Sequence, residues 1–454
     1  MVEADEELLI GRTLPEPSLT FTLPSIHDGT TLDCRVYHPF SLSISPRAPP
    51  WQRHAAIVAH PYAPLGGSCD DRIVDATAST LLRLGYLVCT FNFRGASGSA
   101  GRTSWTAKAE RADYMSVAGF VAHYAHFLDP FKRAEPAGHL PMPQTAQHTP
   151  VLLLAGYSYG AMITTQLPSI DTILAAFKAP ESGTPAAEIR LRAEYMADTE
   201  NAILASARAA ALERQNGNAP MSPRRAMAMR IGGDEQNRKS HDLPRRSFSL
   251  DADQKFRDMI NKARKGHVKR ASSVSVVQRK ASGTVSRDHL KDATGVNIKI
   301  LETMTRFQPA YLLISPIQGY VANLATMSIS YPFGQKAAKP PKTTKAEQDG
   351  TRSPTELNPA HLAWEAEHKL TNNPTLAIYG DRDVFVAAKS LRNWSKRLEA
   401  VPASQFRAHE VSTAGHFWTE ERVLFIMRDA VKTFAKELLT SESAVPELTL
   451  RAGK

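Results

Sequence analysis

The chain has 454 residues, enough for one large domain with additions or for two to three ordinary domains. Hydrophobic residues make up 42% and charged residues 22%, a composition typical of a globular protein rather than a disordered one. The formal net charge is +10, but the segment 221–290 holds 17 Lys and Arg against 7 Asp and Glu and accounts for all of the excess. The fold outside that segment is therefore neutral, which argues against a basic nucleic-acid-binding fold.

The cysteines and the N-terminus indicate a reducing compartment and no export. Three cysteines occur, an odd number without CxxC spacing, which predicts neither a disulfide framework nor a cysteine-rich zinc site: Cys34, Cys69 and Cys89. The first residues are acidic where a secretory signal would be basic, and no apolar run approaches the roughly 20 residues that a membrane span needs. We therefore expect a cytoplasmic protein without a membrane span.

The first third of the chain predicts alternating strands and helices. Two opening runs, 18–23 and 32–37, are separated by a turn signal and predict a hairpin. The continuous apolar run 55–59 is typical of a strand that is buried on both faces of a parallel sheet. Next in order come a helix that ends at Gly85, a strand over 86–93, a helix over 106–128 and a strand over 151–155. This alternation predicts the α/β class.

The α/β pattern is interrupted after the helix that begins near Tyr159. Pro185 and Gly217 bracket an alanine-rich helix, and the chain from there to about 290 is basic and low in apolar periodicity. The pattern then resumes, with strands predicted over 311–314, 375–379 and 406–411 and a helix over 420–438. We expect an N-terminal part over 1–179, a largely disordered basic insertion over 180–300, and a C-terminal part over 301–454 with a linker at 336–358.

The segment Gly156-Tyr157-Ser158-Tyr159-Gly160 matches the GxSxG pattern of a nucleophile elbow. In such an elbow the serine occupies a strained turn between a strand and a helix, and the glycines let neighbouring backbone approach without Cβ clashes. The alternative is a structural glycine turn. The strand predicted before this segment and the helix predicted after it favour Ser158 as a nucleophile.

A serine hydroxyl is a weak nucleophile at neutral pH, so it needs a base to take its proton and a third group to orient that base. In proteins with this elbow, the acid follows the serine along the chain and the histidine follows the acid. This sequence offers candidates for both in that order. Asp381 and Asp383 both follow the strand predicted over 375–379, and Asp381 can instead serve the turn itself. His416 follows the last predicted strand, and the glycine before it leaves room for the imidazole to turn toward the serine.

The intermediate of acyl transfer carries a negative oxygen, which two backbone N–H groups must stabilise. One donor is the residue after the nucleophile, Tyr159, and the other comes from the loop that begins at His60. Pro61 has no N–H, so Tyr62 is the predicted second donor. His60 can be interpreted as a metal ligand, but no partner lies at ligand spacing, and we expect it to fix the loop.

Several short motifs together resemble the α/β-hydrolase superfamily, close to its dienelactone-hydrolase-like and dipeptidyl-peptidase-like members. They are His60-Pro61, Gly66-Gly67, Asn92-Phe93-Arg94-Gly95, Gly98-Ser99, Gly101, the GxSxG segment, Gly380-Asp381-Arg382-Asp383 and Gly415-His416-Phe417. The resemblance covers about 50–165 and 308–440. It implies an α/β-hydrolase fold, a mostly parallel sheet flanked by helices, and the Gly-x-x-Asp spacing favours Asp383 as the acid. Arg94 is expected to be structural or to support the oxyanion loop.

The resemblance implies a serine hydrolase that cleaves an ester, thioester or amide through an acyl-enzyme, with Ser158, His416 and Asp383 as its triad. The expected partner is a small-molecule or peptide acyl substrate, and no metal or organic cofactor is expected. Esterase and peptidase activity both remain open, although nothing resembles the companion domain of a dedicated peptidase. The alternative is a non-catalytic scaffold of the same fold whose basic insertion binds a partner.

The insertion contains a separate signal. Ser272 and Ser282 each lie two residues after a pair of basic residues, the pattern that basophilic kinases recognise. We therefore hypothesise a kinase as a partner that phosphorylates this region. The alternative is a solvated basic loop without function. Aromatic residues that would stack on bases are almost absent between 257 and 290, so binding to nucleic acid is not expected.

Overall fold

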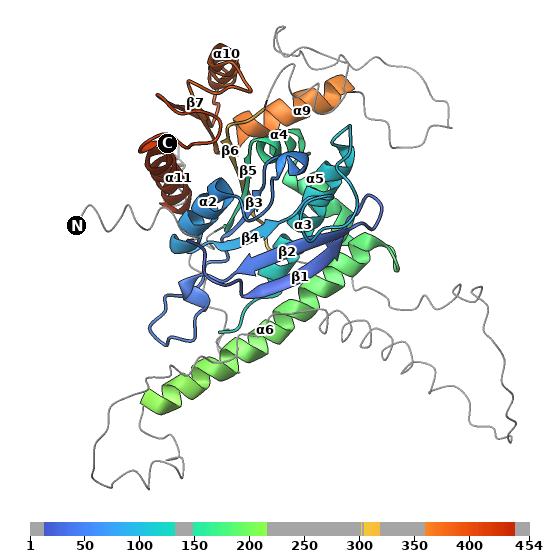
Figure 1. The fold of residues 1–454 in the computed structure, drawn as a ribbon. Helices are drawn as coiled ribbons and strands as arrows, with labels where there is room; N and C mark the ends of the chain where they lie inside the picture. Colours follow the sequence, from blue (N-terminus) through green and yellow to red (C-terminus); the bar gives the residue numbers. More distant parts are fainter. Residues whose placement is uncertain (1–12, 132–148, 216–300, 302–303, 318–358, 441–454) are drawn as a thin grey trace, which may run out of the picture.

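The computed structural model describes residues 13–131, 149–215, 301, 304–317 and 359–440 (Figure 1). Its centre is an eight-stranded sheet in the order β1-β2-β4-β3-β5-β6-β7-β8. The strands are β1 (Leu19–Pro24), β2 (Thr31–Tyr37), β3 (Ala55–Ala59), β4 (Leu87–Phe91), β5 (Val151–Tyr157), β6 (Gln308–Ile314), β7 (Thr375–Gly380) and β8 (Phe406–Val411). The β1–β2 and β2–β4 pairs are antiparallel, and every other pair is parallel. The predicted hairpin and the mostly parallel sheet are confirmed.

Helices cover both faces of this sheet (Figure 1). They are α2 (Arg72–Arg83), α3 (Lys108–Phe127), α4 (Tyr159–Gln166), α5 (Ile170–Lys178), α6 (Pro185–Gln215), α9 (Pro359–Asn372), α10 (Ala388–Glu399) and α11 (Val423–Thr440), with short 3-10 turns η1 (Phe40–Leu42) and η2 (Ala63–Leu65). Helices α2 and α11 pack on one face, whereas α3, α4, α5 and α6 pack on the other. The predicted flanking helices are therefore confirmed.

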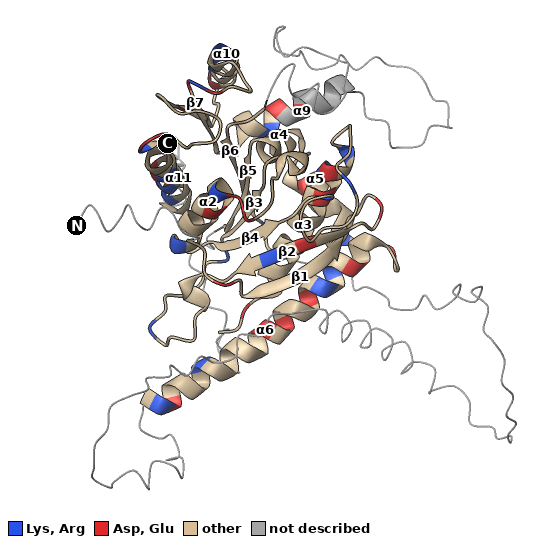
Figure 2. Ribbon diagram, viewed as in Figure 1, with Lys and Arg blue, Asp and Glu red and all other residues tan. Residues whose placement is uncertain are grey.

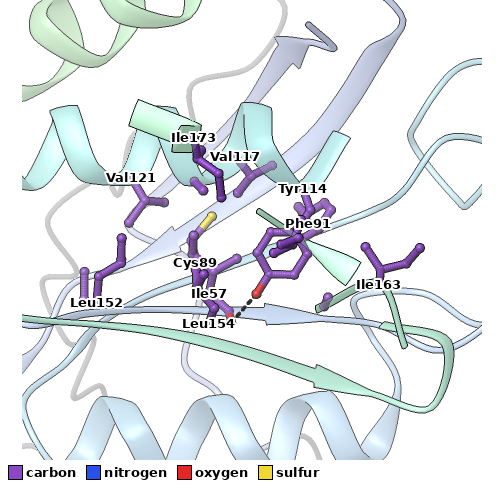
Figure 3. Close-up of a cluster of buried hydrophobic side chains, with 14 of the residues drawn as sticks. Ile57, Cys89, Phe91, Tyr114, Val117, Val121, Leu152, Leu154, Ile163 and Ile173 are labelled. Carbon is purple, nitrogen blue, oxygen red and sulfur yellow. Dashed lines mark hydrogen bonds between the residues drawn. The ribbon is translucent and has the colours of Figure 1, made fainter. Parts of the chain in front are cut away.

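The central strands are apolar on both sides because both sides face helices. Every residue of β3, β4 and β5 is buried, and these strands carry no charged residue in Figure 2. Figure 3 shows Ile57 and Leu154 beneath Val117 and Val121 of α3. In the same cluster the hydroxyl of Tyr114 donates to main-chain carbonyls of the strands. A buried polar group without a partner would be destabilising, so these bonds let a tyrosine belong to the core.

The strand order places a topological switch point between β3 and β5. From β3 the chain passes through α2 to β4 on one side, and then crosses back through α3 to β5 on the other side. The helices that follow β3 and β5, α2 and α4, consequently lie on opposite faces of the sheet. Loops that diverge in this way leave a crevice at the carboxyl ends of the strands, which is where open α/β sheets bind ligands.

Helix α4 is capped at its C-terminal end by a buried lysine. The side-chain amino group of Lys369, from α9, donates to the carbonyl of Thr164 at 2.9 Å and also to that of Leu167. Burial lowers the pKa of Lys369 well below its usual value. The last carbonyls of a helix lack intrahelical partners and carry negative partial charge, so a donor from another element both satisfies them and fixes the two helices together.

Some predicted elements differ from the structure. The C-terminal helix begins at Val423 instead of 420, because Arg422 has a φ of 64°, which an α-helix cannot accommodate. Helices α5, α9 and α10 were not predicted, whereas the alanine-rich helix is confirmed as α6. Most of the predicted insertion, the linker 336–358 and both Ser272 and Ser282 lie outside the described residues. Within the described residues, no helix is both long and apolar enough to cross a membrane.

Gly119 of α3 tests how tightly this core is packed. A Cβ at this position would lie 2.3 Å from Cε2 and Cζ of Phe177 in α5. Alanine is favoured over glycine within a helix by about 1 kcal/mol, but an extra methyl group forced into a filled core costs about 1–3 kcal/mol. We therefore expect Gly119→Ala to lower the free energy of unfolding by about 1 kcal/mol, as measured by urea denaturation.

The matched control removes the opposing ring. Phe177→Leu lacks the two clashing ring atoms, so the double variant should lose less stability than the sum of the two single variants. A Gly119→Ala protein that is as stable as the wild type would contradict this description of the α3–α5 contact.

Candidate active site

Ser158 lies at the sharp turn between β5 and α4. Its φ is 54° and its ψ is −113°, a conformation that non-glycine residues rarely adopt, and its side chain is buried. The serine N–H donates to the carbonyl of Ile314 at 2.8 Å, which joins this turn to the end of β6. Strain of this kind persists only where the surrounding structure holds it.

The two glycines of the turn have the role that the sequence predicted for them. A Cβ on Gly156 would lie 2.3 Å from the carbonyl carbon of Gly160. A Cβ on Gly160 would lie 2.6 Å from the carbonyl oxygen of Ala59, at the end of β3. Both clashes are with backbone atoms, which cannot rotate away as a flexible side chain can. The turn therefore requires glycine at both positions.

The structure brings the three predicted triad residues into one hydrogen-bonded line. Oγ of Ser158 lies 2.8 Å from Nε2 of His416, and Nδ1 of the same ring lies 2.7 Å from Oδ2 of Asp383. All three side chains are buried. They come from loops after β5, β7 and β8, whose carboxyl ends share one edge of the sheet. Residues 158 and 416 are thus adjacent although 258 positions separate them.

The two rival aspartates have different partners. Oδ2 of Asp383 faces His416, while its Oδ1 accepts the N–H groups of Phe385 and Val386 at 2.8 and 3.0 Å. Asp381 instead accepts the N–H of Thr413 at 2.7 Å and the hydroxyl of Ser412 at 3.2 Å. Asp381 therefore joins the loop after β7 to the loop after β8, and Asp383 alone of the two is bonded to the imidazole.

The predicted oxyanion residues follow two neighbouring strands, β3 and β5. Tyr159 begins α4, so its N–H has no acceptor within the helix. Tyr62 immediately precedes η2, after β3, and its ring lies 5.1 Å from that of Tyr159. A Cβ at Gly67 would lie 2.4 Å from the carbonyl oxygen of Pro61, so the loop that carries Tyr62 is tightly folded. The roles of these two N–H groups remain predictions.

His60 fixes the loop, as expected. Its Nε2 accepts the N–H of Phe93 at 2.8 Å, and its Nδ1 lies 2.5 Å from the carbonyl oxygen of Pro61. Burial lowers the pKa of His60 to about 4, so the ring is neutral at neutral pH. A neutral ring can accept one bond and donate the other, which is the pattern seen here.

Arg94 and Asn92 have separate structural roles. Arg94 pairs with buried Asp113 of α3 at 2.7 Å and with Asp28 in the β1–β2 turn at 2.9 Å, away from the triad. Asn92 accepts the N–H of Cys69 at 2.8 Å, which joins the loop after β4 to the segment that enters α2. The expectation that Arg94 is structural agrees with these contacts, and Asn92 supports the loop that contains Tyr62.

Sequence reasoning did not identify the side chains that hold the histidine loop, residues 413–418. The hydroxyl of Tyr157 donates to the carbonyl of His416 at 2.9 Å, and the indole N–H of Trp418 donates to Oγ of Ser315 at 3.1 Å. No spacing pattern links residues 157 and 416. The only local signal was the presence of a polar aromatic residue directly before the nucleophile.

Searches for related proteins give structural neighbours but no sequence relatives. No protein family matches the chain by sequence, and no curated protein does. One neighbour is a serine hydrolase without a lid from Xanthomonas campestris, 16% identical, with 95% of this chain and 99% of that chain covered and a TM-score of 0.40. Another is an esterase from Butyrivibrio proteoclasticus with bound ferulic acid, 12% identical, with 92% and 99% covered and a TM-score of 0.38. A third is an esterase from Pyrococcus furiosus, 10% identical, with 92% of each chain covered and a TM-score of 0.40.

The fold assignment rests on this chain's own features. The parallel strands β3 to β8, the antiparallel β1 and β2 at one edge, and the strained strand-to-helix turn at Ser158 are those of the α/β-hydrolase fold predicted from the motifs. The molecule is thus an α/β-hydrolase-fold protein, and its activity must be argued from the site.

Proposed function

We propose that the protein is a serine hydrolase that cleaves an ester, thioester or amide through an acyl-enzyme intermediate. One observation carries the proposal: hydrogen bonds of 2.8 and 2.7 Å run from the hydroxyl of Ser158 through His416 to Asp383, in a buried setting. These distances lie within the range that proton transfer between a nucleophile and its base requires. A protein that only binds a partner has no need of this arrangement.

In the first half of the proposed reaction, Oγ of Ser158 attacks the carbonyl carbon of the substrate. Nε2 of His416 takes the hydroxyl proton as the bond forms, and the carboxylate of Asp383 stabilises the resulting imidazolium. The backbone N–H groups of Tyr62 and Tyr159 are proposed to stabilise the negative oxygen of the tetrahedral intermediate. That intermediate collapses when His416 returns the proton to the leaving alcohol, thiol or amine.

In the second half, water takes the place of the leaving group. His416 removes a proton from the water as its oxygen attacks the acyl carbon, and the same proton then returns to Oγ of Ser158 when the acid product leaves. Oδ1 of Asp383 is already bonded to two backbone N–H groups, so the carboxylate stays in one orientation through both halves.

Exposed apolar side chains favour a substrate with an apolar group. Six large apolar side chains among the described residues are more than half exposed, and four of them lie on loops that follow β3, β4, β7 and β8: Leu65 (75%), Trp105 (69%), Val384 (78%) and Phe417 (58%). The ring of Phe417 lies 5.5 Å from that of His416. Apolar surface gathered around one edge of a sheet typically marks a binding region. We propose that the acyl or alcohol group of the substrate lies against these loops.

Labelling with a fluorophosphonate probe tests the nucleophile. The probe should react with the wild-type protein and transfer its phosphonyl group to Oγ of Ser158 with loss of fluoride, because a base-activated serine attacks such electrophiles. Ser158→Ala should lose labelling entirely and lose hydrolysis of short p-nitrophenyl esters by at least about 10³-fold. Equal labelling of the wild type and Ser158→Ala would refute the proposed enzymatic activity and favour the alternative of a non-catalytic scaffold.

A pair of isosteric variants distinguishes the two aspartates. Asp383→Asn removes the charge that stabilises the imidazolium and should lower kcat by about 10²–10⁴-fold. Asp381→Asn is the control on the same loop, since Asp381 bonds to Ser412 and Thr413 and not to the imidazole, and it should lower kcat far less than Asp383→Asn does. If Asp381→Asn were the more damaging of the two in steady-state ester hydrolysis, the assignment of the acid would be wrong.

The proposed apolar contact predicts a chain-length effect. Each methylene group that a long acyl chain buries contributes about 0.8 kcal/mol, so removing its contact surface affects long esters more than short ones. Phe417→Ser should lower kcat/KM for a p-nitrophenyl octanoate by about 10-fold and for the acetate by less than about twofold. Phe425→Ser, which alters an equally exposed residue of α11, should change neither value. A uniform effect of Phe417→Ser on both esters would refute the contact.

A further inference from the structure

Side chains at the ends of β5 and β6 form hydrogen bonds to the histidine loop. The same two strand ends also position Ser158. Tyr157 is the last residue of β5 and directly precedes Ser158 in the chain. Ser315 directly follows β6, whose last residue, Ile314, accepts the N–H of Ser158. The two residues that bond to the histidine loop, Tyr157 and Ser315, are therefore chain neighbours of Ser158 and of Ile314, the residue that accepts the Ser158 N–H.

The bond from Tyr157 is the more direct. Its hydroxyl donates to the carbonyl of His416 at 2.9 Å, and the two rings lie 5.8 Å apart. The phenol is buried, and burial raises its pKa, so it keeps its proton and remains a donor. Tyr157 belongs to the same buried apolar cluster as Ala414 and Trp418 of this loop. A single residue therefore connects the backbone of the nucleophile turn to the backbone of the base.

The bond between Trp418 and Ser315 restrains the other side of the loop. Both residues have positive φ values, 55° for Trp418 and 45° for Ser315, which are strained for side chains of this kind. Trp418 is fully buried, and its indole N–H lies 3.1 Å from Oγ of Ser315. A buried indole N–H without an acceptor would be destabilising. The bond therefore fixes the point at which the histidine loop leaves the site.

We propose that Tyr157 is a positioning residue whose hydrogen bond to the main chain of His416 sets the distance between the base and Ser158, with the Trp418–Ser315 bond as its partner restraint. This inference rests on the proposed hydrolase activity. Neither residue touches the reacting atoms. Their effect is on the 2.8 Å contact between Oγ and Nε2, where a displacement of about 1 Å can cost about 10²-fold in rate.

The test compares Tyr157→Phe with Tyr86→Phe. Tyr86 is the matched control because it too is a buried tyrosine whose hydroxyl donates to a main-chain carbonyl, that of Ala435 in α11, at 3.0 Å. It directly precedes β4, at the end of the parallel strands opposite to the triad. Each variant removes one such bond and should lower stability to a similar extent. Only Tyr157→Phe should lower kcat for ester hydrolysis, by about 10-fold with KM unchanged, and slow fluorophosphonate labelling by a similar factor.

A second measurement does not depend on turnover. The proton on Nδ1 of His416 lies in a short, buried bond to a carboxylate and should give a far-downfield proton NMR signal that exchanges slowly with water. That signal should broaden or disappear in Tyr157→Phe and persist in Tyr86→Phe. Ser315→Ala provides an independent variant, expected to lower kcat by a few-fold, and the double variant with Tyr157→Phe should lose more than the product of the two.

The outcomes distinguish failure of the positioning role of Tyr157 from failure of the proposed hydrolase activity. If the wild type hydrolyses esters and Tyr157→Phe matches it in kcat and in the NMR signal, the positioning role is refuted and the hydrolase remains. If the wild type neither labels nor hydrolyses, the proposed function fails, and an unchanged Nδ1 signal in Tyr157→Phe then refutes the restraint by itself. Equal losses of kcat in Tyr157→Phe and Tyr86→Phe would show a general effect of stability and overturn the inference.

Discussion

The candidate site depends on close approaches of backbone to backbone, two of which join different loops. At Gly160 a Cβ would lie 2.6 Å from the carbonyl oxygen of Ala59, and at Gly380 a Cβ would lie 2.0 Å from that of Ala414. The first contact places helix α4, which follows Ser158, against the end of β3. The second places the loop of Asp383 against the loop of His416. Without them the loops after four strands could not meet within hydrogen-bonding distance.

The strained backbone at the candidate site has an energetic cost that the rest of the fold must offset. Positive φ values at Ser158, Ser315 and Trp418 cost on the order of 1–3 kcal/mol each, whereas a hydrogen bond contributes only about 0.5–1.5 kcal/mol. The bonds at the site cannot hold this geometry unaided. The buried strands β5 and β6 and the helices on both faces must supply the remainder.

Sequence reasoning located what is local and missed what depends on long-range contact. The GxSxG turn was recognisable because its strand, its glycines and its helix are contiguous, and Asp383 and His416 could be found because each follows a strand in a glycine-containing loop. The contact of Tyr157 with His416 spans 259 positions and carries no spacing signature. The choice between Asp381 and Asp383 likewise followed from a resemblance, and the physical reason for it appears only in their different bonding partners.

The missed helices show a second limit. In α10 the buried residues Leu391, Trp394 and Leu398 recur at helical spacing, so the pattern was present but short and flanked by many charges. Conversely, the C-terminal helix was predicted to begin too early because acidic residues before Val423 look like a first turn, while the backbone at Arg422 is left-handed. The local sequence indicates that a helix is present, but packing against neighbouring elements determines the residue at which it begins.

The segment from Asn92 to Arg94 shows how one short stretch can serve different parts of the fold. The side chain of Asn92 joins the loops on the site edge, and the N–H of Phe93 is bonded to His60. Arg94 turns away to the carboxylates of Asp28 and Asp113, and the Arg94 guanidinium holds the pKa of Asp28 below its usual value. Through this segment the antiparallel hairpin, α3 and the loop that contains Tyr62 form one connected unit, so the hairpin helps to hold that loop in place.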